Sequence, residues 1–188
     1  MRQETIVRNI YKYEELSEAA KKSAKERYNE LDIDLVTELL IDIVEEAGFK
    51  GADVYWSLSY CQGDGACFVG RGWRGEELEK IVTKAYKGEV PKNIKRILPF
   101  VNEYIVTHSG RYYHYNSCRG EIYFEREVTR AEKYVEELEE VLEEYRKEVC
   151  QRLEDSGYKN IEYFMSEEYF AELCELNEWE FTEEGVMI

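Results

Sequence analysis

The sequence predicts an α+β fold, with a mainly antiparallel sheet, helices packed on one face and a long acidic helix towards the C-terminus. Strand-like alternation recurs in short segments, and apolar residues at helical spacing recur in others. The 188 residues are 44% hydrophobic, so the chain can bury a core without disulfides or metal. An aromatic content of 14%, including 16 tyrosines, excludes a disordered chain.

The first elements are a strand followed by two helices. Two apolar sets interleave over residues 5–13, which predicts a strand with one mostly buried face. Ser17 is a helix N-cap before an alanine-rich run that reaches about Tyr28. From Asp34 onward, apolar residues fall at helical spacing until Gly48 supplies a stop.

A β-hairpin comes next. Residues 54–60 alternate, and 66–70 form a second strand after the Gln62-Gly63-Asp64-Gly65 turn. The loop is longer than two residues, so its glycines are expected to serve turn geometry.

Helices and strands then alternate in blocks. A helix is predicted over 76–86, and Pro91 opens a short helix that stops before Pro99. Three further strands are predicted at 101–108, 112–115 and about 120–127, the first two joined at Ser109-Gly110.

The longest helix opens at the capping box Thr129-Arg130-Ala131-Glu132 and runs to about Asp155, with Gly157 as its end. Its apolar residues form one stripe, and glutamates occupy the other face. Ser166 caps a last helix, which leads to an edge strand or docked tail at 179–181. These elements predict a core domain at 1–128 and an acidic helical C-terminal region at 129–188 packed on it.

Charge is concentrated near the C-terminus. The chain carries 41 acidic and 25 basic side chains, a net charge of -16. Residues 154–188 hold 11 acids and one base, whereas 53–125 hold 9 and 10. The negative electrostatic field of this region repels phosphates and attracts basic proteins. We therefore expect a basic partner protein that itself binds nucleic acid, and no direct binding of nucleic acid by this chain.

The remaining composition bears on compartment and redox state. No stretch approaches 18 apolar residues and no secretory signal opens the chain, so the expected location is cytoplasmic, with no membrane contact. The five cysteines are odd in number and irregularly spaced, so we expect mostly buried thiols and not a disulfide framework.

Two segments could carry chemistry. The Gly-rich loop offers Gln62 and Asp64 but lacks the signature of a phosphate loop. Both histidines, His108 and His114, lie in one short segment with Tyr113. A zinc site would need Cys118 or a carboxylate as a further ligand, and the spacing of these residues matches no standard zinc motif. An enzyme or ligand-binding protein would bring these side chains into one pocket, but we expect no catalytic residue, metal or cofactor.

The chain resembles a family of small phage and prophage proteins. The strings Gln-Gly-Asp-Gly-Ala-Cys-Phe at 62–68 and His-Ser-Gly-Arg-Tyr-Tyr-His at 108–114 carry the resemblance, together with Trp56 to Cys61 and the segment after Tyr13. It spans roughly residues 5–130. Members are usually described as hypothetical proteins or as antitoxins of a toxin–antitoxin system. The resemblance implies a mobile-element setting and no catalytic residues.

The leading hypothesis is therefore a non-enzymatic acidic inhibitor, of the anti-CRISPR or anti-defence type, that blocks a basic nucleic-acid-handling protein as a nucleic-acid mimic. An antitoxin that covers a toxin is the nearest alternative, followed by the ligand-binding protein or enzyme and by an assembly protein that forms a homo-oligomer. The partner-binding residues of the leading hypothesis are acidic side chains of the last two helices, namely Glu136, Glu140, Glu143, Glu144, Glu167 and Glu168.

Overall fold

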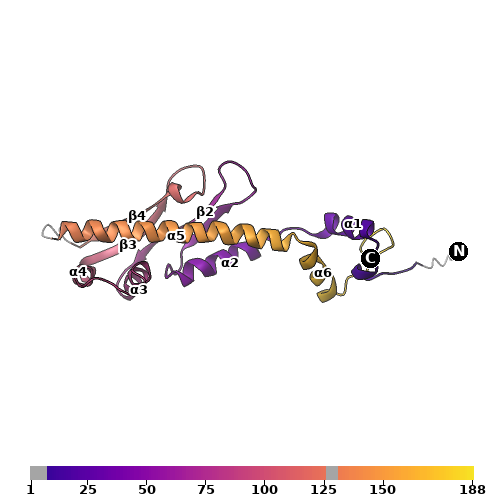
Figure 1. Ribbon diagram of the computed structural model, residues 1–188, viewed down its shortest axis with the longest axis horizontal. Helices are drawn as coiled ribbons and strands as arrows, with labels where there is room; N and C mark the ends of the chain where they lie inside the picture. The colour runs from indigo at the N-terminus through magenta and orange to yellow at the C-terminus, as the bar shows by residue number, and fades with distance from the viewer. Residues whose placement is uncertain (1–7, 126–130) are drawn as a thin grey trace, which may run out of the picture. The chain divides into compact units, whose positions relative to one another are not determined.

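The computed structural model describes residues 8–125 and 131–188 and has the predicted α+β fold (Figure 1). Its helices are α1 (Glu18–Tyr28), α2 (Ile33–Glu46), α3 (Glu76–Ala85), α4 (Lys92–Ile97), α5 (Glu132–Phe164) and α6 (Glu167–Leu176). Its strands are β1 (Asp53–Ser57), β2 (Gly65–Trp73), β3 (Val101–His108) and β4 (Cys118–Phe124). Short 3₁₀ turns lie at Tyr13–Glu15, Leu98–Phe100 and Tyr115–Ser117.

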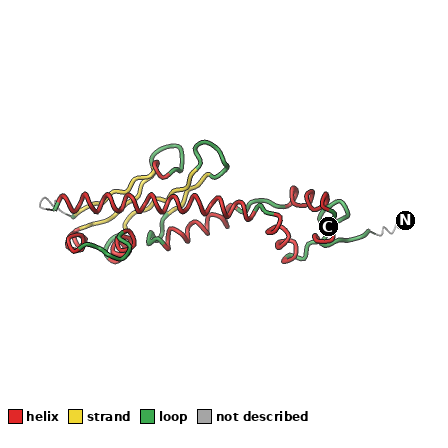
Figure 2. Tube along the Cα trace, viewed as in Figure 1, coloured by secondary structure: helices red, strands yellow, loops and turns green. Residues whose placement is uncertain are grey.

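The four strands form one antiparallel sheet in the order β1-β2-β3-β4. Because each strand pairs with the next along the chain, the β1–β2 and β3–β4 connections both lie at one end of the sheet (Figure 2). The hairpin predicted from 54–60 and 66–70 is confirmed as β1 and β2.

Phe49, just after α2, is the centre of the core beside the sheet. Its ring centroid lies 4.6 Å from that of Phe68 on β2, 5.2 Å from Trp73 and 5.9 Å from Tyr145 on α5. All but Tyr145 are fully buried, so one aromatic cluster joins the sheet to the helices that pack on it. The buried stripe of α5, Leu138, Leu142, Val149 and Leu153, follows the predicted spacing.

The chain folds into two compact units. The sheet unit is Asp34–Tyr158, and the terminal unit combines the described residues up to Ile33 with Lys159–Ile188. This division differs from the expected boundary after residue 128, because α5 contributes to both units and the two chain ends share one core.

The terminal unit has a core of its own. Residues from both ends of the chain make it, namely Tyr13, Leu16, Ala20, Ala24, Phe170, Cys174 and Phe181. Ser17 caps α1 by accepting a hydrogen bond from the backbone N–H of Ala20 at 3.3 Å, as predicted, and Ser166 caps α6 in the same way.

The strand predicted at 5–13 is wrong where the structure describes it, and residues 5–7 lie outside the described part. Tyr11 forms only an isolated bridge with Phe181, with two backbone hydrogen bonds of 2.9 Å, and Tyr13 already begins a 3₁₀ turn. At Tyr11 the chain pairs with the C-terminal tail at Phe181, so the segment at 179–181 is a docked tail.

The strand predicted at 112–115 is also wrong. Residues 112–114 belong to the loop before the 3₁₀ turn Tyr115–Ser117, and Tyr115 begins that turn. The ring of Tyr113 packs on Tyr55 of β1, whereas those of His114 and Tyr115 pack on each other. The strand predicted at about 120–127 is β4, which starts at Cys118 and ends at Phe124; residues 126 and 127 are not described.

The long helix is confirmed, but its predicted end is wrong. α5 continues through Gly157 to Phe164. Gly157 is there because a Cβ would collide with Leu58, so the glycine makes room for a neighbouring side chain and does not stop the helix. Thr129 and Arg130 of the predicted capping box lie outside the described residues. No helix in the described residues is both long and apolar enough to cross a membrane.

Candidate functional site

The β1–β2 loop (58–64) and the β3–β4 loop (109–117) lie at the same end of the sheet (Figure 2), and they contact each other at Gly63 and Gly65. Gly63 has a φ of +103°, and a Cβ there would lie 2.6 Å from the ring of Tyr112. At Gly65 the approach is to backbone, because a Cβ would lie 2.7 Å from the Cα of His114. The two glycines therefore allow the loops to close on each other, which brings the two distinctive strings of the sequence together.

Asp64 organises the β1–β2 loop. Its Oδ2 accepts hydrogen bonds from the backbone N–H groups of Ser59 at 2.7 Å and Cys61 at 3.0 Å, and from the hydroxyl of Tyr158 at 2.8 Å. Its Oδ1 accepts from the Cys61 thiol at 3.1 Å. Desolvation raises the pKa of Asp64, but these hydrogen bonds outweigh it and hold the pKa well below its usual range. Asp64 therefore acts mainly within its own loop.

α5 contributes two side chains beside this loop. The ring of Tyr158 packs on that of Tyr60 at 4.7 Å, and burial followed by the Asp64 hydrogen bond raises the pKa of Tyr158 to about 12. One turn earlier, burial raises the pKa of Glu154, while His114 opposes that shift and Asp64 adds to it. Glu154 is thus within electrostatic reach of both loops.

The two histidines lie in different surroundings. His108 Nε2 lies 2.9 Å from the carbonyl oxygen of Tyr112, and since a carbonyl can only accept, Nε2 carries the proton. His114 Nδ1 accepts a hydrogen bond from the backbone N–H of Asn116 at 3.2 Å. Both imidazoles thus bind backbone of the β3–β4 loop, His108 from the end of β3 and His114 from within the loop.

A groove of about 650 Å³ opens over β1, β2, β3 and the β3–β4 loop. His108 and Tyr113 line it, and their rings pack together with that of Tyr55. Arg71 from β2 and Arg111 from the β3–β4 loop also line it, in a protein with a net charge of -16. The groove combines aromatic faces with guanidinium groups.

Of the five ligand-binding residues predicted from the sequence, the groove unites only His108 and Tyr113; Gln62, Asp64 and His114 are not among its described lining residues. Gln62 is exposed in the neighbouring loop. Sequence reasoning missed Tyr55, Arg71 and Arg111. Strand alternation could have indicated the first two, since Tyr55 and Arg71 are outward positions of neighbouring strands.

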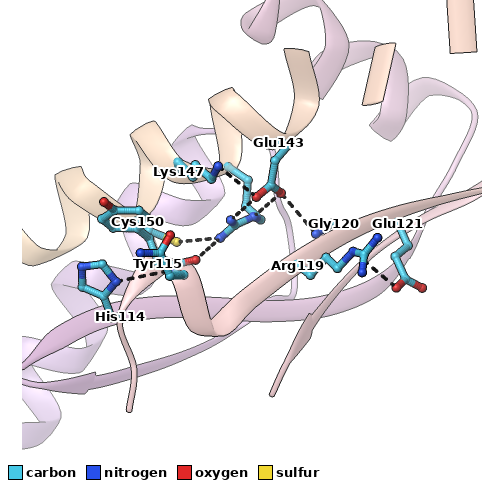
Figure 3. A network of polar contacts seen from close by, with 10 residues as sticks. His114, Tyr115, Arg119, Gly120, Glu121, Glu143, Lys147 and Cys150 are labelled. Carbon is cyan, nitrogen blue, oxygen red and sulfur yellow. Dashed lines mark hydrogen bonds and ion pairs between the residues drawn. The ribbon is translucent and has the colours of Figure 1, made fainter. Parts of the chain in front are cut away.

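Sequence reasoning also missed a buried arginine on α5, whose partners Glu143, Tyr115 and Cys150 are labelled in Figure 3. Arg146 on α5 is 0% exposed and donates two hydrogen bonds to the Glu143 carboxylate, at 2.6 and 2.8 Å, and one to the carbonyl of Tyr115 at 2.9 Å. Desolvation lowers the pKa of Arg146, but the Glu143 hydrogen bond reverses the shift and raises it. The Glu143 carboxylate also accepts from the backbone N–H of Gly120, so it ties α5 to β4.

The cysteines are free thiols, and only Cys61 is exposed, which confirms that most are buried. Burial raises the pKa of Cys150 to about 12, so this thiol, 3.8 Å from Arg146, is neutral. Among residues 8–125 and 131–188, no three histidine, cysteine or carboxylate side chains converge as a metal site would require.

The predicted acidic partner-binding residues fall into three groups. Glu136, Glu140 and Glu144 are exposed on α5, whereas Glu143 is bound to Arg146 and Lys147. Glu167 and Glu168 are exposed in the first turn of α6, in the terminal unit. The exposed glutamates of α5 belong to a longer row at four-residue intervals, Glu132, Glu136, Glu140, Glu144 and Glu148, here called the glutamate row.

The amino-acid sequence matches one protein-family model. Residues 16–168 match the family described as Domain of unknown function (DUF8835). The chain belongs to this family. The matched region contains both contacting loops, the groove and the glutamate row, so these features lie within the family domain. No curated protein and no solved structure matches the chain.

Proposed function

We propose that this protein is a non-enzymatic acidic inhibitor that binds and blocks a basic, nucleic-acid-handling protein. The glutamate row is the observation that carries the proposal. All five side chains are exposed, and none forms an ion pair with a described basic side chain. Like charges at this spacing destabilise a helix, so an unneutralised row has a cost that a cationic partner would offset.

The row has the dimensions of an extended binding surface. Each four-residue step advances about 6 Å along the axis, so the five carboxylates extend over about 24 Å. Such a line of negative charge resembles a nucleic-acid strand to a groove lined with lysine and arginine, and it speeds encounter with that groove.

The resemblance to phage and prophage proteins supports an anti-defence role, of which anti-CRISPR inhibition is one form. An antitoxin that covers a basic toxin would use the same surface and form the same kind of complex. Both versions place the protein with its partner in the host cytoplasm.

The test uses charge reversal on the row. Glu136, Glu140 and Glu144 are changed together to lysine, and the tagged protein is used to capture partners from nuclease-treated host lysate. We expect a basic protein that the wild type retains and the variant loses, with affinity lower by about tenfold or more and with release by salt.

A matched control reverses three exposed acids of α2, Glu38, Asp42 and Glu45, which changes the net charge equally. The control should retain the partner, and circular dichroism should show both variants folded. If the triple variant of the row captures the same proteins as the wild type, the row is not the binding surface and the proposal fails.

A further inference from the structure

The groove over the sheet is lined by side chains of two kinds. The packed rings of Tyr55, Tyr113 and His108 form its aromatic wall, and the guanidinium-bearing Arg71 and Arg111 also line it. Its volume of about 650 Å³ lies within the range of small-molecule sites. None of its described lining residues belongs to the glutamate row, so ligand binding in the groove is independent of the proposed inhibitor function.

The two arginines are available to a ligand. Both are exposed, and neither guanidinium forms a hydrogen bond or ion pair with another described residue. By contrast, the guanidinium of Arg146 forms an ion pair with Glu143. Two unpaired guanidinium groups at one groove of a protein with net charge -16 are complementary to a compact anion, and the guanidinium fork matches the oxygens of a phosphate or a carboxylate. A phosphate is the one of these two anions that is commonly attached to a planar ring system, which the aromatic wall would hold.

The aromatic wall is held in place and still accessible. Tyr55 and Tyr113 lie nearly parallel, with centroids 5.7 Å apart and an interplanar angle of 24°, and His108 lies 5.5 Å from Tyr113. The hydrogen bond between His108 and the Tyr112 carbonyl fixes this imidazole against the loop. Tyr55 nevertheless remains 41% exposed, so part of its side chain is accessible to the ring of a ligand.

We propose that this groove binds a nucleoside monophosphate unit, with its base stacked on Tyr55 and its phosphate held by Arg71 and Arg111. The chemistry requires both parts, a planar ring and a phosphate. The unpaired carboxylate of Asp53 in the same groove disfavours multiply charged anions and can accept a hydrogen bond from a ribose hydroxyl or a base amino group.

A free nucleotide is the expected source of this unit. A polynucleotide would bring many phosphates into the negative field of the whole chain, whereas a mononucleotide brings one into the locally basic groove. A single strand offers the same chemistry at each of its units, and the experiment separates the two sources.

The test measures binding to the full-length protein by isothermal titration calorimetry. The probes are the four nucleoside monophosphates, adenosine, inorganic phosphate and a single-stranded tetranucleotide. We expect at least one monophosphate to bind at roughly millimolar affinity or better, with adenosine and phosphate each weaker by about tenfold or more. Equal or weaker binding of the tetranucleotide identifies the free nucleotide as the source, and tighter binding identifies a single strand.

Variants tie the binding to the groove. Arg71→Gln and Arg111→Gln should each weaken monophosphate binding by about tenfold, and Tyr55→Ala should do the same. Arg119→Gln is the matched control, because Arg119 is an exposed arginine outside this groove whose guanidinium pairs with Glu121, and it should bind like the wild type. These positions are exposed, so thermal midpoints should stay close to that of the wild type.

Two results would overturn the inference. One is that no monophosphate, at millimolar concentration, produces binding heat in calorimetry or shifts the protein's NMR resonances. The other is monophosphate binding that Arg71→Gln and Arg111→Gln leave unchanged while both variants remain folded, since the phosphate would then be bound elsewhere.

Discussion

Asp64 shows how one side chain can look functional in the sequence and act structurally in the fold. Its carboxylate accepts hydrogen bonds from Ser59, Cys61 and Tyr158, which fix both ends of the β1–β2 loop and join it to α5. These bonds keep the pKa of Asp64 well below its ordinary value of 3.8, against the effect of desolvation. The stability that they contribute therefore depends on ionisation.

Asp64→Asn should lower the free energy of unfolding by about 1 to 2 kcal/mol at neutral pH. A carboxyl group whose pKa is depressed in the folded state stabilises fully above its unfolded pKa, and that stability is lost as pH falls towards the folded pKa. The difference between wild type and variant should therefore be constant above about pH 5 and shrink towards pH 3. Urea denaturation followed by circular dichroism across this range measures it.

Asp42→Asn serves as the control, because Asp42 is exposed on α2 and accepts no hydrogen bond from a described residue. Its difference from the wild type should stay near zero at neutral pH. A difference for Asp64→Asn that does not change with pH would mean that the carboxylate is not the stabilising form.

At the scale of elements, the contact between the two loops positions the groove. The β1–β2 loop supports the β3–β4 loop, which in turn carries Tyr113 and Arg111 to the groove. Gly65 is the point of that contact at which the approach is to backbone, that of His114. The packing of the β1–β2 loop therefore positions the β3–β4 loop residues of a groove whose other lining residues come from β1, β2 and β3.

Gly65→Ala should displace the β3–β4 loop and lower the free energy of unfolding by about 1 to 3 kcal/mol, because backbone atoms cannot move aside as a flexible side chain can. NMR spectra should show shifted resonances for His108 and Tyr113.

Gly88→Ala provides the contrast for this prediction. Gly88 has a φ of +92° but nothing within 4 Å of a Cβ, so the variant carries backbone strain without a collision. It should leave the resonances of His108 and Tyr113 in place. If Gly65→Ala does the same, the close approach of the loops does not position the groove.

At the scale of the whole molecule, the chain has two cores. Phe181 belongs to the core of the terminal unit, where its ring lies 6.2 Å from that of Tyr13 and 6.5 Å from that of Tyr28. Phe68 belongs to the core of the sheet unit, with Phe49 and Trp73. The two clusters share none of these residues.

Phe181→Ala should destabilise the terminal unit by about 3 to 5 kcal/mol, because it leaves a cavity among buried rings. Amide hydrogen exchange should accelerate in α1 and α6 while β3 remains protected. Phe68→Ala should give the reverse pattern. Equal loss of protection in both units after either substitution would show that the chain unfolds as one cooperative body.

The sequence by itself determined the elements whose signals are local. The β1–β2 hairpin, the caps at Ser17 and Ser166, and the apolar stripe of α5 depend on neighbours a few residues away, and all are confirmed. The pattern also singled out the glycine-rich loop, which contacts the β3–β4 loop, and His108 with Tyr113, which line the groove, because glycines and clustered rings mark unusual local geometry.

The tertiary structure decided what depends on distant partners. In the sequence, a glycine such as Gly157 is compatible with a helix end or with close packing. The close approach of Leu58 in the fold shows that it serves close packing. Arg146 can be buried because the Glu143 carboxylate neutralises its charge and the Tyr115 carbonyl accepts another of its hydrogen bonds. That carbonyl comes from a distant segment of the chain. Arg71, Arg111 and Tyr55 are ordinary surface residues in the sequence, and chain folding brings them to one groove. A pattern of residue types records which side chains are available, whereas long-range contacts decide which of them meet.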